Sequence, residues 1–596
     1  MPARWAGLVS VAVLVALISP ARAASAHADA IIVGAGPGGL AAALEAARGG
    51  ARIVVIDVAS VFGGHAVVSE GGLSFAGTPL QTSLGYRDSP DQMVADIERL
   101  GGDVRLEWAR LFAERGVPEI HDWLASMGVT FISVQRLNGN SVPRFHENPR
   151  RGFGVVEPLY RAALASGAVE FVWNTRATRL IVEDGRVVGV EGRNERTGAA
   201  TSWRAPSVVL ATGGFQANLA LVRAHWPRET PAPARILIGA GANAHGSGLD
   251  LARAAGARLE RLDHQWNYPR GIADPRYASG ERGLNVIFGT RFLWLNARAE
   301  RIWAEKVEDM QAQPDGRVLV IFDAAGRADF RVSGADWADR SKVEALLDDP
   351  AIARKASSLA ALARVAKLPE QPLVDAVAAW NALVASGEDR ELDLFSKANG
   401  TFASPTGVRP RVIARPPFHA VEVWPLTRKS MGGVAIDMQC RALDGDGRPI
   451  PGLYAVGEVA GFGGLNGKAT IEGAFIAPAM LQGRIAGRAI ASATGRAPLT
   501  AAAPVPSSSS PAPGTAPPAP CAACHQMNAL LATPRAGFWH FERVHRRVAE
   551  SQLECVACHA EMTPFRPERH RIDRVAQIDS CRHCHLPPPA ARASGR

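Results

Sequence analysis

Lysine is scarce in this sequence, and apolar runs of membrane-spanning length are absent. Only seven of the 66 basic residues are lysine, so arginine carries most of the positive charge. The one notable apolar run covers residues 6–18, whereas a membrane-spanning helix needs ~20 residues. Small residues follow at Ala21 and Ala23, as at a signal-peptidase site. The sequence therefore predicts a secretory signal peptide over residues 1–23 and a periplasmic location, with a signal anchor as the alternative.

The overall composition is that of a globular protein. Hydrophobic residues make up 47% and charged residues 21% of the 596 residues, which excludes wholesale disorder. The formal net charge is +9, but the basic excess is spread along the chain. Because an exported protein meets no nucleic acid, we expect no nucleic-acid partner.

Cysteine is also rare, and six of the seven cysteines belong to three copies of the motif Cys-x-x-Cys-His. The seventh, Cys440, stands alone and is expected to be a buried small apolar residue. Two thiols at i and i+3 with an adjacent histidine are typical of c-type haem attachment, whereas a zinc or redox motif would not require the histidines. We predict three haem c groups, bound by Cys521, Cys524, Cys555, Cys558, Cys581 and Cys584, with His525, His559 and His585 as proximal iron ligands.

The remaining C-terminal histidines suggest the second axial ligands. Bis-histidine ligation would need three more histidines, and it favours electron relay over oxygen binding. Met527 and Met562 compete for one site, and a solvated histidine is the alternative at each position. The candidate distal ligands are His540, His545 and His570.

Composition separates this haem module from the rest of the chain. Residues 497–520 contain eight prolines and four consecutive serines, which is typical of a semi-extended linker. Residues 521–596 contain too few apolar residues for a conventional core. We therefore predict a small, mostly helical or irregular multihaem cytochrome c domain there.

The N-terminal region carries a dinucleotide-binding pattern. A short apolar strand over residues 30–33 leads into a glycine turn, and a second strand over residues 53–56 ends at an acidic residue. Such glycines permit a tight turn and backbone approach to a pyrophosphate, while the acid binds a ribose hydroxyl. The pattern alone does not separate FAD from NAD. Its residues are Gly34, Gly36, Gly38, Gly39 and Asp57.

Three further segments resemble the flavoprotein family of fumarate reductase and succinate dehydrogenase. Together with the haem motifs, they make the whole chain similar to a periplasmic flavocytochrome c. The resemblance implies an α/β fold: a two-dinucleotide-fold FAD domain (residues 29–263 and 430–496) with an inserted α+β capping domain (264–429). The residues that would contact FAD are Gly63, Gly64, His65, Gly71, Gly72, Thr212, Gly213, Gly457, Glu458 and Gly473.

His65 has two interpretations. It precedes Gly71 by six residues, the spacing at which membrane-bound members of the family carry a histidine bonded covalently to the flavin. The alternative is a histidine that only packs or hydrogen-bonds beside FAD.

The family's substrate-binding histidines and arginines have no counterparts here. At the matching positions stand Tyr268, Lys429 and Lys468. Lysine is a compact charge whose pKa shifts on burial, so both lysines could bind an anion or donate a proton. Surface lysines without a role are the alternative. Tyr268, Arg291 and Arg301 are the secondary catalytic candidates.

The resemblance implies an oxidoreductase that reduces an activated C=C bond of an unsaturated organic acid, and the replaced catalytic residues indicate a substrate other than fumarate. A membrane quinol dehydrogenase or a periplasmic cytochrome would supply electrons to the haems, which pass them to FAD. Two alternatives stay open: a dehydrogenase of a saturated substrate that exports electrons through the haems, and an electron shuttle without a substrate.

Overall fold

A computed structural model describes residues 28–498, except 138, 288–291, 305, 335–336, 338 and 393–409. The predicted signal peptide, the haem motifs with all their proposed ligands, most of the linker and Arg291 lie outside the described residues.

The first layer of the fold is a six-stranded sheet in the order β21-β22-β10-β1-β2-β6. Five strands are parallel, and β21 pairs antiparallel with β22 at the edge. The strands β1, β2 and β10 are buried apolar runs, as expected where helices or further sheets cover both faces. The strands are β1 (Ala30–Val33), β2 (Ile53–Ile56), β6 (Val169–Val172), β10 (Val208–Leu210), β21 (Arg441–Leu443) and β22 (Pro449–Ala455).

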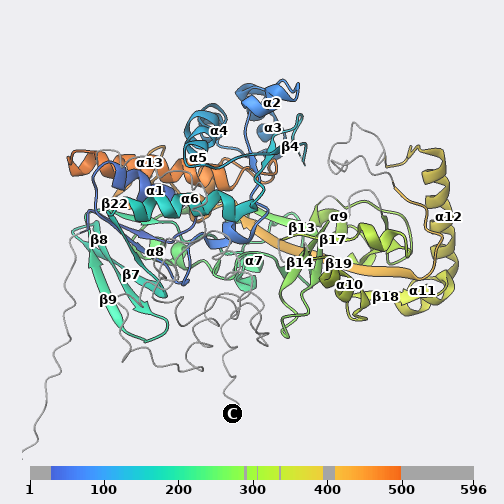
Figure 1. Ribbon diagram of the computed structural model, residues 1–596. Helices are drawn as coiled ribbons and strands as arrows, with labels where there is room; N and C mark the ends of the chain where they lie inside the picture. Colours follow the sequence, from blue (N-terminus) through green and yellow to red (C-terminus); the bar gives the residue numbers. More distant parts are fainter. Residues whose placement is uncertain are drawn as a thin grey trace, which may run out of the picture.

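Helices α1 (Pro37–Arg48), α6 (Arg151–Ala165) and α13 (Ile476–Thr494) pack together at this sheet (Figure 1). Glycines bring α1 and α13 close, since a Cβ on Gly483 would lie 2.2 Å from the carbonyl oxygen of Gly38. An antiparallel sheet of β7 (Thr175–Glu183), β8 (Arg186–Asn194) and β9 (Ala200–Arg204) completes this domain.

A second, larger sheet forms the cap, in the order β15-β16-β19-β13-β14-β17, with β11 and β18 also on β19. Its long strand β19 (Phe418–Ser430) extends from the cap towards the FAD domain, as Figure 1 shows. Helices α10 (Arg340–Asp348), α11 (Leu359–Ala366) and α12 (Glu370–Ser386) belong to the cap. The other strands are β11 (Leu237–Ile238), β13 (Gln265–Ala273), β14 (Gly283–Ile287), β15 (Leu293–Asn296), β16 (Val318–Phe322), β17 (Arg331–Val332) and β18 (Ala353–Ala356).

Shorter elements connect these layers. The strand pair β12–β20 lies next to the end of β19, and the sheet β3-β5-β4 lies beside a group of helices. The shorter elements of the whole fold are α2 (Pro79–Ser83), α3 (Pro90–Gly101), α4 (Leu106–Gly116), α5 (Asp122–Ser126), α7 (Leu219–Ala224), α8 (Ser247–Ala254), α9 (Val307–Gln311), η1 (Gly64–Val68), β3 (Leu73–Ser74), β4 (Ser133–Gln135), β5 (Phe145–Glu147), β12 (Leu259–Glu260) and β20 (Gly433–Val434).

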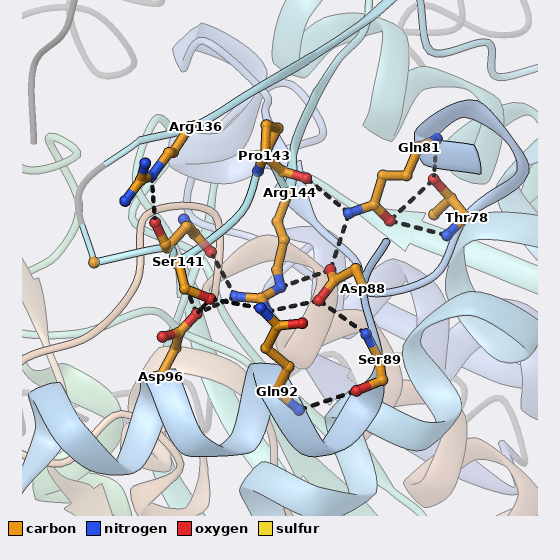
Figure 2. A network of polar contacts seen from close by, with 12 residues as sticks. Thr78, Gln81, Asp88, Ser89, Gln92, Asp96, Arg136, Ser141, Pro143 and Arg144 are labelled. Atoms are coloured by element: carbon orange, nitrogen blue, oxygen red, sulfur yellow. Dashed lines mark hydrogen bonds and ion pairs between the residues drawn. The ribbon is translucent and has the colours of Figure 1, made fainter. Parts of the chain in front are cut away.

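A buried arginine joins α3 to the segment before β5. The side chain of Arg144 is fully buried and makes two hydrogen bonds to Asp88, of 2.7 and 2.6 Å, and a further ion pair with Asp96 (Figure 2). Ser141 also donates its hydroxyl to Asp96, at 2.6 Å. Phe145 follows directly and packs where any side chain on Gly72 would stand, so the network holds this segment against the glycine loop.

The predicted α/β fold class, with a two-dinucleotide-fold domain and an inserted α+β cap, is confirmed. Cys440 is fully buried, as expected. Of the helices that the structure describes, none combines the length and apolar character that a membrane span requires.

Candidate functional site

A cavity of about 1420 Å³ runs from the glycine turn after β1 to the cap strands β13, β14 and β19. One end is lined by Gly34 and Asp57, and the other by side chains such as Tyr268 and Arg428. The loop 63–72 and the segment before α13 line it in between. Such a long cavity between a dinucleotide turn and a cap is suited to a cofactor and a substrate placed end to end.

The glycine turn is shaped for a phosphate group. A Cβ on Gly39 would lie 1.9 Å from the carbonyl oxygen of Gly34, so glycine is required for α1 to approach β1. A Cβ on Gly36, in contrast, would meet no protein atom within 4 Å. Gly36 is also the N-cap of α1, whose N-terminus favours negative charge. These features fit the pyrophosphate of FAD, and Gly38 lines the same wall.

Asp57 stands at the end of β2 with both carboxylate oxygens oriented. They accept hydrogen bonds from the backbone N–H groups of Ala35, at 2.6 Å, and Ala59, at 2.7 Å. Burial raises the pKa of Asp57 to about 6, although the two hydrogen bonds oppose the shift. Each oxygen keeps a further lone pair, so the carboxylate can accept a ribose hydroxyl.

The loop that precedes β3 is built from glycines with left-handed backbones. Gly63 has φ 97° and Gly71 has φ 70°, conformations that favour glycine. A Cβ on Gly64 would meet only Gly36, at 3.5 Å, so the backbone of this loop is exposed to the cavity. Gly72 completes the loop and lines the same cavity.

The later flavoprotein segments reach the same cavity. The hydroxyl of Thr212 is buried without a hydrogen-bond partner among the described residues, and a Cβ on Gly213 would meet nothing within 4 Å. Gly457 donates its N–H to Gln482 at 2.8 Å, and Glu458 accepts the N–H of Ser430 at 3.0 Å. An unpartnered hydroxyl beside open backbone fits a polar cofactor such as FAD.

His65 and Lys429 meet inside the cavity. The Nζ of Lys429 lies 3.2 Å from Nδ1 of His65, although the two residues are 364 positions apart. Burial, followed by the charges of Lys429 and Arg428, holds the pKa of His65 well below its usual value. Burial also lowers the pKa of Lys429. The imidazole is therefore neutral at neutral pH, and its Nδ1 can accept a hydrogen bond from the amino group of Lys429.

Tyr268 lies in the cavity on β13 and donates a hydrogen bond from its hydroxyl to Oε1 of Glu472, at 2.7 Å. The guanidinium groups of Arg270 and Arg428 lie over its ring, 4.8 and 5.1 Å from the centroid. Burial and then Glu472 raise the pKa of the Tyr268 phenol. The sequence patterns did not single out Glu472, although its place directly before Gly473 offered a signal.

Two arginines at the cap end were also missed. Arg428 donates to the carbonyl oxygen of Gly239 at 3.0 Å, and Arg282 donates to that of Ala240 at 2.9 Å. Within the described part of the chain neither lies at ion-pair distance from a carboxylate, although Asp274 acts on Arg282 from further away. The Nε of Arg428 is buried without a partner there. These positive charges can therefore bind an anion.

Two predicted catalytic residues lie outside the lining of the cavity. Lys468 has 56% of its side chain exposed and pairs with Glu229 at 2.9 Å. The turn at Gly467, with φ 59°, places Lys468 at the surface. Arg301 donates to Asp389 at 3.0 Å beneath the cap helix α12. We therefore leave both out of the proposed catalytic set.

Comparison with known proteins gives two family matches. The model of the family described as FAD binding domain matches residues 29–475. The model described as cytochrome c7 and related cytochrome c matches residues 510–586, which include the three haem motifs.

Individual relatives differ in their named activity. A "KsdD-like steroid dehydrogenase" of Mycobacterium tuberculosis H37Rv is 30% identical over 544 residues, which cover 78% of this chain and 96% of the relative. "Probable fumarate reductase Ifc3" of Shewanella frigidimarina is 29% identical over 471 residues, with 77% and 74% covered. The solved open conformation of a flavocytochrome c3 fumarate reductase superimposes with a TM-score of 0.62 at 26% identity, over 78% of each chain.

Proposed function

We propose, since the chain belongs to the FAD binding domain family and ends in a cytochrome c7 module, that it reduces an activated C=C bond of an unsaturated organic acid in the periplasm. The haem module would receive electrons from a membrane quinol dehydrogenase or a periplasmic cytochrome. Three haem c groups, one at each Cys-x-x-Cys-His motif, are part of the proposal.

The FAD would be held along the cavity by the glycine turn after β1, Asp57, the loop 63–72 and the turn at Gly457. When bound, FAD would exchange a hydride with the substrate and single electrons with the haems. The chain's own side chains would bind the acid, exclude water and move the proton.

The positive charge at the cap end carries the proposal. Arg282 and Arg428 direct their hydrogen bonds to backbone carbonyl oxygens, which leaves their charges without an ion-pair partner in the described chain. Lys429 adds a third basic side chain to the same cavity. A substrate carboxylate could accept charge-assisted hydrogen bonds from these groups, whereas a neutral substrate could accept only weaker, uncharged-acceptor hydrogen bonds.

A second function, dehydrogenation of a saturated substrate with export of electrons through the haems, is supported by the relative named as a steroid dehydrogenase. A neutral steroid offers no anionic group to Arg282 and Arg428, so we place this function second. The positive charges of Arg282 and Arg428 in the cavity also favour an enzyme over an electron shuttle without a substrate.

A two-way screen of the purified, haem- and flavin-loaded protein tests the proposal. Oxidation of reduced methyl viologen is followed with fumarate, crotonate and urocanate. Dye reduction is followed with their saturated counterparts and with 4-androstene-3,17-dione. We expect activity with an unsaturated acid. Activity in dye reduction alone would establish the dehydrogenase, and activity in neither direction would contradict both enzymes.

The variant Arg428→Gln tests the observation that carries the proposal. Hydrogen bonds to charged groups contribute about 1.5–3 kcal/mol, so the KM for the acid should rise by ~10–150-fold. Arg110→Gln, at a half-exposed arginine on α4, is the control and should leave the KM unchanged. An unchanged KM in Arg428→Gln would show that this cation does not bind the substrate.

A further inference from the structure

The cavity contains a hydrogen-bonded pair of side chains that the sequence motifs do not bring together. The hydroxyl of Tyr268 donates to Glu472 at 2.7 Å, and both side chains line the cavity. The two residues are 204 positions apart, one on β13 and one in the segment before α13. The fold therefore brings a phenol and a carboxylate together at the substrate end.

Hydrogen bonds to its backbone hold Glu472 in position. The hydroxyl of Ser74 donates to the carbonyl oxygen of Glu472 at 2.6 Å, and the N–H of Ser74 donates to that of Gly473 at 3.2 Å. Gly473 has φ 93°, and a Cβ there would lie 2.6 Å from the Ser74 hydroxyl. This close backbone approach to β3 holds Glu472 in place for Tyr268.

The phenol is equally well placed. Trp266 meets the Tyr268 ring edge-on at 6.3 Å, and Arg270 and Arg428 lie over the ring. Burial raises the pKa of Tyr268, so the hydroxyl stays protonated at neutral pH. The two guanidinium groups stabilise negative charge that develops on its oxygen while a proton moves.

We propose that Tyr268 and Glu472 form the proton relay of the CH–CH reaction, with Tyr268 in contact with the substrate and Glu472 acting through it. This inference rests on the proposed function. In the reduction, the β-carbon of the acid gains the hydride that FAD chemistry supplies, and the C=C bond becomes a single bond. The α-carbon takes the proton of the Tyr268 hydroxyl, and Glu472 passes a proton from water to the phenolate oxygen that remains.

The balance of this step sets its pH dependence. Reduction consumes one proton, which reaches Tyr268 from water through Glu472, and dehydrogenation reverses each transfer. The charged groups that face Glu472 are Arg270, Arg428 and Lys429, together with Tyr268. Reduction should therefore slow as pH rises, and dehydrogenation should speed up.

The test uses the loaded protein and the acid with the highest rate in the screen. Removal of a general acid lowers rates by ~10²–10⁴-fold. We expect Tyr268→Phe to lower kcat by this factor with the KM within ~3-fold, and Glu472→Gln to lower kcat similarly. Glu472→Gln should also lose the pH dependence, and Glu472→Asp should restore part of it. Tyr86→Phe and Glu98→Gln, at exposed positions, are the matched controls.

Two readouts separate chemistry from structure. Flavin content and the Soret spectrum should be unchanged in the variants, and dithionite should still reduce the flavin. If Tyr268→Phe loses its flavin, the two Glu472 variants decide the question.

A Tyr268→Phe rate within ~3-fold of wild type, or a wild-type pH profile in Glu472→Gln, would overturn the relay but leave the proposed function intact. No wild-type turnover with any compound would overturn the proposed function and the relay with it.

Discussion

Replacing Arg144 by methionine should destabilise the FAD domain strongly. The arginine side chain is fully buried, as is that of Asp88, and Asp96 has 6% of its side chain exposed. The variant Arg144→Met removes the cation and leaves two buried carboxylates without it (Figure 2).

The size of the effect follows from this burial. Breaking a buried ion pair from one side costs about 3–5 kcal/mol, because the remaining charge is left uncompensated. An unfolding entropy of ~2 cal/mol/K per residue gives ~1 kcal/mol/K for a domain of this size, so Tm should fall by ~3–5 °C. Arg110→Met, in an ion pair whose side chains are 53% and 82% exposed, should lower stability by less than ~1 kcal/mol.

The pH dependence gives an independent check. Burial raises the pKa of Asp96, but hydrogen bonds from Ser141, Arg144 and Arg99 outweigh burial and hold this pKa below its usual value. A carboxylate with a lowered pKa stabilises the fold above its unfolded pKa, and this stability is lost as pH falls through the folded pKa. The stability lost in Arg144→Met should therefore be largest near pH 7 and shrink below about pH 4.

Scanning calorimetry of the flavin-loaded protein, with flavin release followed by fluorescence, measures the effect. Flavin should be released more readily, since Phe145 packs at Gly72 in the glycine loop. The double variant Arg144→Met/Asp88→Asn should recover part of the loss. If Arg144→Met lowers Tm no more than Arg110→Met does, the assignment of a buried, charged network is refuted.

Three further predictions concern the cofactors. Gly36→Val should fold with an unchanged apoprotein Tm but bind no flavin in an absorbance assay, because a Cβ there would meet no protein atom within 4 Å and Gly36 lines the cavity; retained flavin would contradict this. Acid precipitation should release all the flavin, because the hydrogen bond from Lys429 makes His65 a weaker nucleophile; yellow fluorescence on the proteolytic 60–72 peptide would show covalent attachment. The pyridine haemochrome assay should fall from three haems to two in Cys581→Ala/Cys584→Ala, and an unchanged count would refute haem binding at that motif.

Local features made much of the fold predictable from the sequence. A strand, a glycine turn, a helix and a second strand ending at Asp57 follow one another within about 30 residues, so their spacing alone specifies their contacts. The flavoprotein resemblance, the fold class and the presence of FAD and c-type haem domains are confirmed by the family matches and the sheet topology. The number of haems and their distal ligands stay predictions.

The substrate end was harder to predict, because it depends on contacts between distant segments. Lys429 and Tyr268 line the cavity, but their partners His65 and Glu472 lie 364 and 204 positions away. Position in a family motif does not determine side-chain direction: the turn before Lys468 brings that residue to the surface. Arg428 was overlooked because, in a chain rich in arginine, a single arginine carries little signal.

The position of α13 limits how the two redox modules can be joined. Its residues Ile476 and Ala479 line the cavity, and the helix then continues for 15 residues to Thr494. At 1.5 Å per residue, the helix ends ~22 Å from where it last lines the cavity. Any electron carrier attached beyond that end must be brought back across this span, which takes at least ~7 residues at ~3.1 Å each. Deleting most of the Pro/Ser-rich segment should thus uncouple haem oxidation from flavin reduction while leaving each chromophore intact.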